Sequence, residues 1–376
     1  MTALRNDIDP DGLLEYSVVF TDRSLNHMSQ RFQSVMRDIS TTLREVYHAS
    51  AVALVPGGGT FGMEAVARQF AQDKPVLVIR NGFFSYRWSQ IFAAGKIPAS
   101  ETVLKAAPVE TGANPAYAPA RIADVVATIA KEKPAVVFAP HVETAAGVIL
   151  PDDYIKAVAD ATHAAGGLFV LDCIASGTVW VDMQALGVDV LISAPQKGWS
   201  ASPCAGLVLF SPRAEAVLNE TQSSSFAADL KKWRQIMQAY ENGGHAYHAT
   251  LPTDALRSFH AAMLEAKAIG FDKLKNAQLE LGRRARALLA GKGYKSLAAP
   301  EFAAPGVVVS YTSDTGIHNS SKFVQSGFQT AAGVPLMCDE SADFRTFRIG
   351  LFGLDKLENI DRTLSYLEQA INKVSA

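Results

Sequence analysis

The sequence predicts a mainly parallel α/β sheet followed by a smaller C-terminal α+β unit. Short runs rich in Val, Ile and Leu alternate with segments of helical periodicity as far as about residue 250. Continuous apolar strands separated by helices are typical of parallel sheets covered on both faces. Beyond that point the pattern changes to one long helical stretch and then further strand candidates. A chain of 376 residues is also long enough for two domains.

The elements of both units can be placed by their periodicity. The larger unit contains strand candidates at 51–56, 75–82, 135–141, 167–173, 188–194 and 205–211. Helical periodicity covers 119–133 and 154–164, and a long helical stretch runs from 252 to 294 with an interruption at Gly270. Strand candidates at 306–312 and 346–352 and a closing helix at 355–374 form the smaller unit. We therefore predict an N-terminal segment (1–20), a large domain (21–255) and a small domain (256–376) that includes the linking helix.

The composition is that of a soluble globular enzyme. Hydrophobic residues make up 48% and charged residues 19% of the chain. The formal net charge is −2 and we find no Lys/Arg-rich run, so nucleic acid is not expected as a partner. The three cysteines show no CxxC spacing and fit a reducing compartment. The N-terminus carries no apolar signal-like region and no apolar stretch reaches membrane-spanning length. We expect a cytoplasmic protein without a membrane partner.

The first strand candidate leads into a glycine-rich turn. The segment VPGGGTFGMEA (55–65) has G-x-G-x-x-G spacing through Gly57, Gly59 and Gly62, and a helix-like sequence follows. Such a turn suits any phosphate that approaches the backbone N–H groups of a helix N-terminus. A dinucleotide site also expects an acidic residue about 20 positions further on. Arg80 ends the second strand candidate instead, and an arginine there suits at best a 2′-phosphate.

Polar groups follow several strand candidates, where open parallel sheets bind their ligands. Asp172 follows the apolar run GLFVL; standing alone, it would most simply be a helix cap or a loop carboxylate. Lys197 lies in SAPQKGW, a segment too apolar for an open surface loop. A lysine shielded from water can have a lowered pKa, which makes its amine available for a Schiff base. With the glycine-rich turn for a phosphate, these are the groups that a pyridoxal phosphate enzyme needs: Asp172 would keep the pyridine nitrogen protonated.

At this point the chain resembles a known family, the class V aminotransferases of the fold type I pyridoxal phosphate superfamily. It is most similar to the alanine–glyoxylate and serine–glyoxylate aminotransferase branch. The resemblance extends from about His27 to the C-terminal helix. It rests on motifs that occur in one order: PGGGTFGMEA, NGFFSYRW, HVETAAGVILP, LDCIAS, SAPQKGW, YHATLP and FRIGLFG. Each motif alone is weak, whereas the ordered set is specific.

The resemblance implies a role for each matching residue. Lys197 and Asp172 would be catalytic, and Arg348 would bind the substrate carboxylate by a bidentate fork. Phe84 would stack on the pyridine ring, Thr144 would hydrogen-bond its phenolic oxygen and Ile174 would pack under it. The phosphate contacts would come from Gly58, Gly59, Thr60 and Gln196, and from Tyr247 and Thr250 of a neighbouring subunit. The resemblance thus implies a homodimer with shared active sites. Gly58 stands where the family commonly has a serine, and GVPLMCDESADF replaces the usual glycine-rich loop before the substrate arginine.

We therefore predict an aminotransferase that moves an amino group from a small amino acid, such as alanine or serine, to pyruvate or glyoxylate. Lys197 would carry the cofactor as a Schiff base. One alternative is a pyridoxal phosphate lyase acting on a small amino acid or an aminophosphonate. A remote alternative is an NADP-binding oxidoreductase, which would leave Asp172, Lys197 and Arg348 without roles. His245 and His248 are three residues apart without an HExxH motif or clustered carboxylates, so no metal site is expected.

Overall fold

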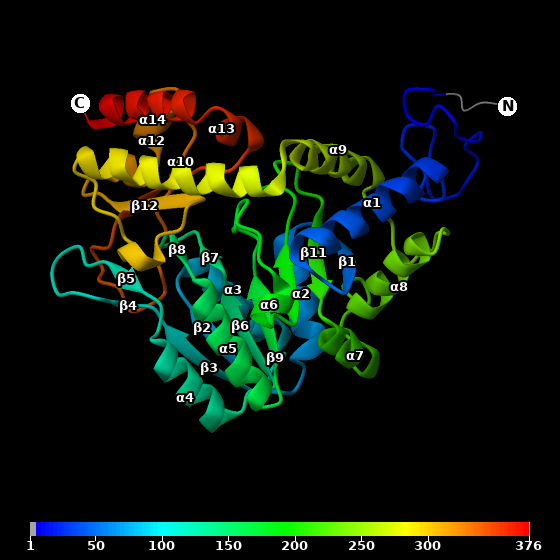
Figure 1. The fold of residues 1–376 in the computed structure, drawn as a ribbon, viewed down its shortest axis with the longest axis horizontal. Coiled ribbons are helices and arrows are strands. Elements are labelled where there is room, and N and C mark those ends of the chain that lie inside the picture. Colours follow the sequence, from blue (N-terminus) through cyan, green and yellow to red (C-terminus); the bar gives the residue numbers. More distant parts are fainter. Residues whose placement is uncertain (1–4, 376) are drawn as a thin grey trace.

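The central feature of the computed structural model, which describes residues 5–375, is a seven-stranded sheet (Figure 1). Its strand order is β1-β11-β10-β9-β6-β2-β3. β11 runs antiparallel to both of its neighbours, and the remaining pairs are parallel. The strands are β1 (Ala51–Pro56), β2 (Pro75–Arg80), β3 (Ser100–Lys105), β6 (Val136–Pro140), β9 (Leu168–Asp172), β10 (Val190–Ser193) and β11 (Ala205–Phe210). The predicted mainly parallel α/β class is confirmed.

The helices of the larger unit surround this sheet. α1 and α8 pack on β1, α2 packs on β11, α3 on β2 and α5 on β9. The helices are α1 (Gln30–Tyr47), α2 (Gly59–Phe70), α3 (Phe83–Gly95), α4 (Ile122–Glu132), α5 (Asp152–Ala164), α6 (Met183–Leu186), α7 (Pro212–Glu220) and α8 (Leu230–Glu241). The short strand pairs are β4 (Ala107–Pro108) with β5 (Tyr117–Ala118), and β7 (Val142–Glu143) with β8 (Val148–Ile149).

The predicted long helical stretch is two helices, α9 (Thr253–Ile269) and α10 (Phe271–Gly291). Gly270 separates them with φ of 103°, a conformation that favours glycine. α9 contributes Phe259 and Met263 to the core of the large sheet, whereas Leu274 of α10 belongs to a second core. The helices thus connect the two cores, as Figure 1 shows across the top of the molecule.

The C-terminal unit is built on a three-stranded antiparallel sheet, β12-β14-β13. It contains β12 (Val307–Tyr311), β13 (Ala331–Ala332), β14 (Thr346–Gly350), the 3-10 helix η1 (Pro300–Phe302), α11 (Thr315–His318), α12 (Ser321–Gln325), α13 (Leu354–Glu358) and α14 (Ile360–Ser375). The single closing helix predicted at 355–374 is wrong, because Asn359 interrupts it with φ of −129° and ψ of 55°. Its side-chain amide donates to the Asp355 backbone oxygen (3.0 Å). The domain boundaries stay a prediction, and residues 1–4 and 376 of the outer segments lie outside the described residues.

The large core buries the apolar runs from which the strands were predicted. Trp88, Trp199 and Trp233 are almost fully buried within it, and aromatic side chains of this size contribute strongly to core stability.

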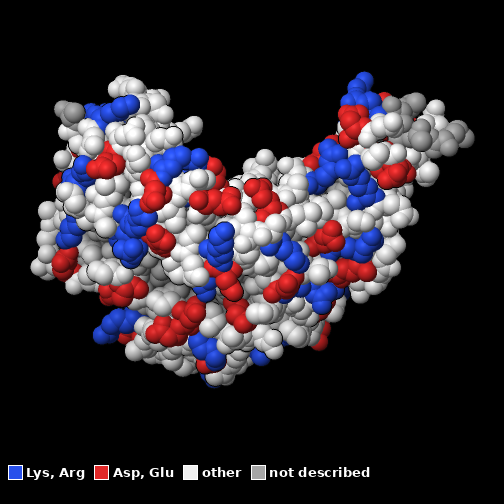
Figure 2. Space-filling view, turned by 45° about the horizontal axis from the view of Figure 1, so that its top comes forward, with Lys and Arg blue, Asp and Glu red and all other residues white. Residues whose placement is uncertain are grey.

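On the face in Figure 2, Lys/Arg and Asp/Glu side chains are interspersed, and a notch opens between the two raised ends of the molecule. No helix within residues 5–375 is long and apolar enough to cross a membrane.

Candidate functional site

Most of the predicted site residues lie where the parallel strands end. In the register, Asp172 is opposite Ile192 of β10 on one side and Pro140 of β6 on the other. The segments after β6, β9 and β10 therefore leave the sheet at one edge. β1 and β2 run in the same direction and end at that edge as well. This edge brings together the glycine-rich turn and the residues around Phe84, Thr144, Asp172 and Lys197.

The glycine-rich turn opens α2 and shapes a cradle at its N-terminus. Gly57 has φ of 121° and Gly58 is the N-cap, so no side chain caps the first N–H groups of α2. A Cβ on Gly59 would overlap the side chain of Ile174, and this close packing requires glycine. Uncapped N–H groups at a helix N-terminus bind anions well. The turn therefore has the form of an anion cradle, and the side chain of Ile174 lies beside it.

Asp172 ends β9 as a buried carboxylate. It is 8% exposed, and its Oδ1 accepts a hydrogen bond from the Ile174 N–H (2.9 Å). Burial raises the pKa of Asp172 to about 6, although this hydrogen bond and the charge of Lys197 oppose the rise. A buried carboxylate is stabilised by a cationic partner, and the protonated pyridine nitrogen of pyridoxal phosphate would be such a partner.

Lys197 lies in the turn after β10 and is only partly accessible. Burial lowers its pKa, and the nearby charges of Asp172 and Glu143 oppose that shift. Its Nζ is 5.7 Å from the ring centroid of Phe352. Trp199, fully buried, anchors the same turn through the neighbouring ring of Trp180, whose centroid is 4.8 Å away. The partial burial of the side chain and the lowered pKa of this amine are both consistent with a lysine that is shielded from water.

Phe84 and Arg348 approach each other from the two units. Phe84 lies in the first turn of α3, and the guanidinium carbon of Arg348 is 5.4 Å from its ring centroid. Arg348 is half-buried on β14, with its Nε donating to the Ala332 backbone oxygen (2.7 Å). Arg345 precedes the strand and is exposed. The geometry therefore selects Arg348 over Arg345 as the guanidinium that faces the site.

The remaining predicted residues are divided between this edge and the surface. Thr144 is buried at the edge, and Gln196 precedes Lys197 with a buried Oε1 that lacks a hydrogen-bond partner among the described residues. Tyr247 and Thr250 lie in the loop between α8 and α9, joined by a hydroxyl–hydroxyl hydrogen bond of 2.9 Å. Tyr247 is 54% exposed. This pair is on the surface of the single chain, free to contact a neighbour.

Glu143 is a residue of the site that the sequence reasoning missed. It is fully buried, and its carboxylate accepts hydrogen bonds from Phe84 N (3.2 Å), Ser85 N (2.8 Å), Ser85 Oγ (2.7 Å) and Ala145 N (2.9 Å). It therefore caps the start of α3 from the adjoining segment and fixes Phe84 relative to Thr144. Its charge also raises the pKa values of Lys197 and Arg348 against the lowering effect of burial. A Glu inside the apolar run FAPHVETAAGVIL was the available signal.

Arg87 was missed as well. Its Nη1 donates to the Thr60 hydroxyl (3.1 Å), and its guanidinium carbon is 5.1 Å from the Phe84 ring centroid. It connects α3, one turn after its start, to the first turn of α2 at the anion cradle. The motif NGFFSYRW contains it, but only the fold brings it to Thr60.

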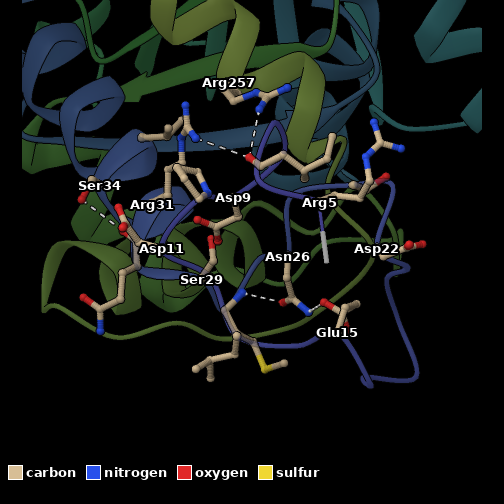
Figure 3. Close-up of a pocket in the computed structure, with 18 of the residues that line it drawn as sticks. Arg5, Asp9, Asp11, Glu15, Asp22, Asn26, Ser29, Arg31, Ser34 and Arg257 are labelled. Carbon is tan, nitrogen blue, oxygen red and sulfur yellow. Dashed lines mark hydrogen bonds between the residues drawn. The ribbon is translucent and has the colours of Figure 1, made fainter. Parts of the chain in front are cut away.

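A separate cavity of about 1080 Å³ lies under the N-terminal segment (Figure 3). Arg31 and Arg257 donate to the Ile8 backbone oxygen there (3.4 and 3.2 Å), and Asn26 donates to Glu15 (2.7 Å). Among the described residues that line it, none is a predicted site residue. These hydrogen bonds fasten the segment to α1 and α9 and offer no catalytic set.

Comparisons with known proteins agree with this geometry. The family model described as Aminotransferase class-V matches residues 13–323. A 2-aminoethylphosphonate–pyruvate transaminase of Syntrophobacter fumaroxidans is 26% identical over 353 residues, which cover 91% of this chain and 89% of that protein. Alanine–glyoxylate aminotransferase 1 of Saccharomyces cerevisiae is 27% identical over 266 residues, 66% of each chain.

A solved structure shows the same fold. The alanine–glyoxylate aminotransferase of Nostoc sp. superposes with a TM-score of 0.76 at 20% identity, covering 92% of this chain and 88% of that one. The family match extends over most of the sequence. It argues against the alternative in which the glycine-rich turn binds NADP in an oxidoreductase. This chain belongs to the class-V aminotransferase family and is an aminotransferase.

Proposed function

We propose that the enzyme transfers an amino group from a small amino donor to a small 2-oxo acid such as pyruvate or glyoxylate, with pyridoxal phosphate as cofactor. The observation that carries the proposal is that Asp172 and Lys197 follow neighbouring strands at one edge of the large sheet, while Arg348 reaches Phe84 at that edge from β14 of the smaller unit. The relatives named above are transaminases of aminoethylphosphonate with pyruvate and of alanine with glyoxylate. They favour amino transfer over the lyase alternative.

The residues present fit the cofactor. The uncapped start of α2 at Gly58, Gly59 and Thr60 would receive the phosphate, and the side-chain –NH₂ of Gln196 would add a donor. Asp172 would accept a hydrogen bond from the ring nitrogen, with Phe84, Thr144 and Ile174 around the ring. The cofactor supplies an electron-withdrawing ring that stabilises negative charge on the substrate carbon next to nitrogen.

The chain's own groups then handle the substrate and its proton. Arg348 holds the donor carboxylate by two parallel hydrogen bonds, which fixes the carbon that loses its proton. The lowered pKa of Lys197 leaves more of its amine neutral, so that Nζ can accept that proton and return it. Glu143 keeps Phe84 in place while this happens.

We also propose a homodimer, in which Tyr247 and Thr250 reach the phosphate of the partner's cofactor. The exposure of Tyr247 and its hydroxyl bond to Thr250 support it, and so do the exposed Phe61 and Phe226. A monomeric mass by light scattering at micromolar concentration would contradict it.

We also propose a cytoplasmic location, which is supported by the three free thiols of Cys173, Cys204 and Cys338. Recovery of the native protein from a periplasmic or secreted fraction would contradict it.

The function is tested by visible absorption of the purified enzyme loaded with pyridoxal phosphate. Alanine, serine, aspartate and 2-aminoethylphosphonate are added separately, followed by pyruvate or glyoxylate. We expect at least one donor to bleach the yellow band and an oxo acid to restore it. A donor that is consumed continuously without any oxo acid would indicate a lyase, and a band that no donor changes would rule out the proposed donors.

The same assay separates Arg348 from its neighbour. For Arg348→Ala we expect the visible band unchanged and the KM for alanine, or for the active carboxylate donor, raised about 10- to 100-fold, as for the loss of a charge-assisted hydrogen bond. Arg345→Ala is the matched control, because Arg345 is exposed on the same segment. Equal effects of the two substitutions would contradict the assignment of the carboxylate to Arg348.

A further inference from the structure

The cofactor groups assigned so far leave a phosphate short of positive charge. Gly58, Gly59, Thr60 and Gln196 are all neutral, as are Tyr247 and Thr250 of the proposed neighbouring subunit, and a helix N-terminus contributes only about half an elementary charge. A phosphate monoester carries a charge of about −1.5 to −2 at pH 7. The amine of Lys197 is assigned to the substrate carbon and its proton. None of these groups brings a full positive charge to the cradle, so a nearby cation would strengthen phosphate binding.

Arg87 is placed to supply such a charge. It lies one turn into α3, and its Nη1 donates to the hydroxyl of Thr60, a residue of the cradle itself (3.1 Å). The Phe84 ring lies 5.1 Å from its guanidinium carbon and limits the positions of the side chain. Arg87 is half-buried. A guanidinium of this kind presents several N–H donors in a planar fork, so a bond to Thr60 leaves others for an anion.

The charge of Arg87 affects the pKa values of two other site residues. Burial is the main cause of the lowered pKa of Lys197, and the charge of Arg87 lowers it further. The same charge lowers the pKa of Asp172, against the larger effect of burial. Arg348, the other guanidinium near Phe84, is held by the Ala332 backbone oxygen on β14. The two arginines therefore reach the site from different units, one beside the phosphate cradle and one from the substrate side.

We propose that Arg87 binds the cofactor phosphate, forming with Thr60 and the start of α2 a charged cradle. This inference rests on the proposed function, because it requires pyridoxal phosphate as the ligand. Gly58 brings no side chain to the N-cap, which leaves room and need for a donor from α3. A purely structural Arg87 would only tie α3 to Thr60 and would not distinguish a phosphorylated ligand from an unphosphorylated one.

The experiment compares two ligands on cofactor-free enzyme. Pyridoxal phosphate and pyridoxal, which lacks the phosphate, are titrated into wild type, Arg87→Ala and Arg87→Lys, with binding followed by tryptophan fluorescence and thermal shift. For Arg87→Ala we expect the Kd of pyridoxal phosphate to rise about 10- to 100-fold and that of pyridoxal to change less than about threefold. Arg87→Lys should recover part of the loss. Arg121→Ala, at an exposed arginine paired with Asp124, is the control expected to match wild type.

The outcomes are distinguishable. An equal rise in the Kd of both ligands would show that Arg87 only positions Phe84, and would overturn the proposal. An unchanged Kd for pyridoxal phosphate with a raised KM for the donor would also overturn it, assigning Arg87 to the substrate's acid group. A wild type that binds neither ligand would instead refute the proposed function. Circular dichroism checks each variant's fold, and Arg87→Lys provides the decisive comparison if Arg87→Ala does not fold.

Discussion

Replacing Lys197 by alanine is expected to lower kcat by at least about 10³-fold, since the change removes both the amine that joins the cofactor and the group that moves the substrate proton. The pKa of this amine is lowered by burial, so it is prepared for both tasks. The measurement is steady-state transamination with a donor that bleaches the visible band of the loaded enzyme. Borohydride reduction of the loaded wild-type enzyme, followed by peptide mass analysis, should place the cofactor on residue 197.

The matched control is Lys267→Ala. Lys267 is exposed and paired with Glu45 at 2.9 Å on the outer surface of α9. Its substitution should leave both kcat and the labelled peptide unchanged, because surface ion pairs contribute little. A Lys197→Ala protein with wild-type turnover, or a cofactor label on a different lysine, would contradict the assignment.

The central strands and the candidate residues Asp172 and Lys197 could be predicted from the sequence because their signals are local. Each central strand is a continuous apolar run, and Asp172 and Lys197 stand out as charges next to such runs. β3 (Ser100–Lys105) was missed because it is an edge strand with polar residues, SETVLK, and pairs on one side only with β2. Edge strands often carry charged residues that discourage further pairing. Apolar periodicity cannot find a strand of this kind.

Glu143 and Arg87 could not be predicted because their roles depend on residues far away in the sequence. Glu143 acts on Phe84 and Ser85, which precede it by more than fifty residues. Arg87 meets Thr60, which comes from the preceding βα unit. Each lies in a quoted motif, but a motif does not show which backbone N–H or hydroxyl its charge will meet.

Asp172→Asn is expected to abolish most activity while making the cofactor-free protein more stable above pH 6. The carboxylate pKa is raised from 3.8 to about 6 by burial. Protonated Asp172 is therefore compatible with the fold, and the protein loses stability as pH rises from about 4 through about 6 and this side chain ionises. The full pKa shift corresponds to a loss of about 3 kcal/mol at most in the free energy of unfolding. Asparagine resembles the protonated acid at every pH, so it avoids this loss.

The measurement is the difference in Tm between cofactor-free Asp172→Asn and wild type across pH 4 to 8. We expect almost no difference near pH 4 and a gain of about 2–5 °C above pH 6, because the other carboxylates titrate alike in both proteins and cancel. Activity should fall at least about 10²-fold, since the amide cannot keep the ring nitrogen protonated. A destabilised variant above pH 6 would contradict the view that this carboxylate is strained without its ligand.

Asp189→Asn provides the contrast on the same sheet. Asp189 is also buried, at 2% exposure, but its carboxylate accepts hydrogen bonds from Phe169 N (2.8 Å) and Ser211 Oγ (3.2 Å) and faces His163 Nε2 (2.8 Å). An amide there would turn an –NH₂ toward a donor, so we expect a lower Tm. The same substitution should thus stabilise the protein where the carboxylate awaits a ligand and destabilise it where the fold supplies the partners. Opposite signs at Asp172 and Asp189 would show that the enzyme keeps an unfavourable buried charge for catalysis.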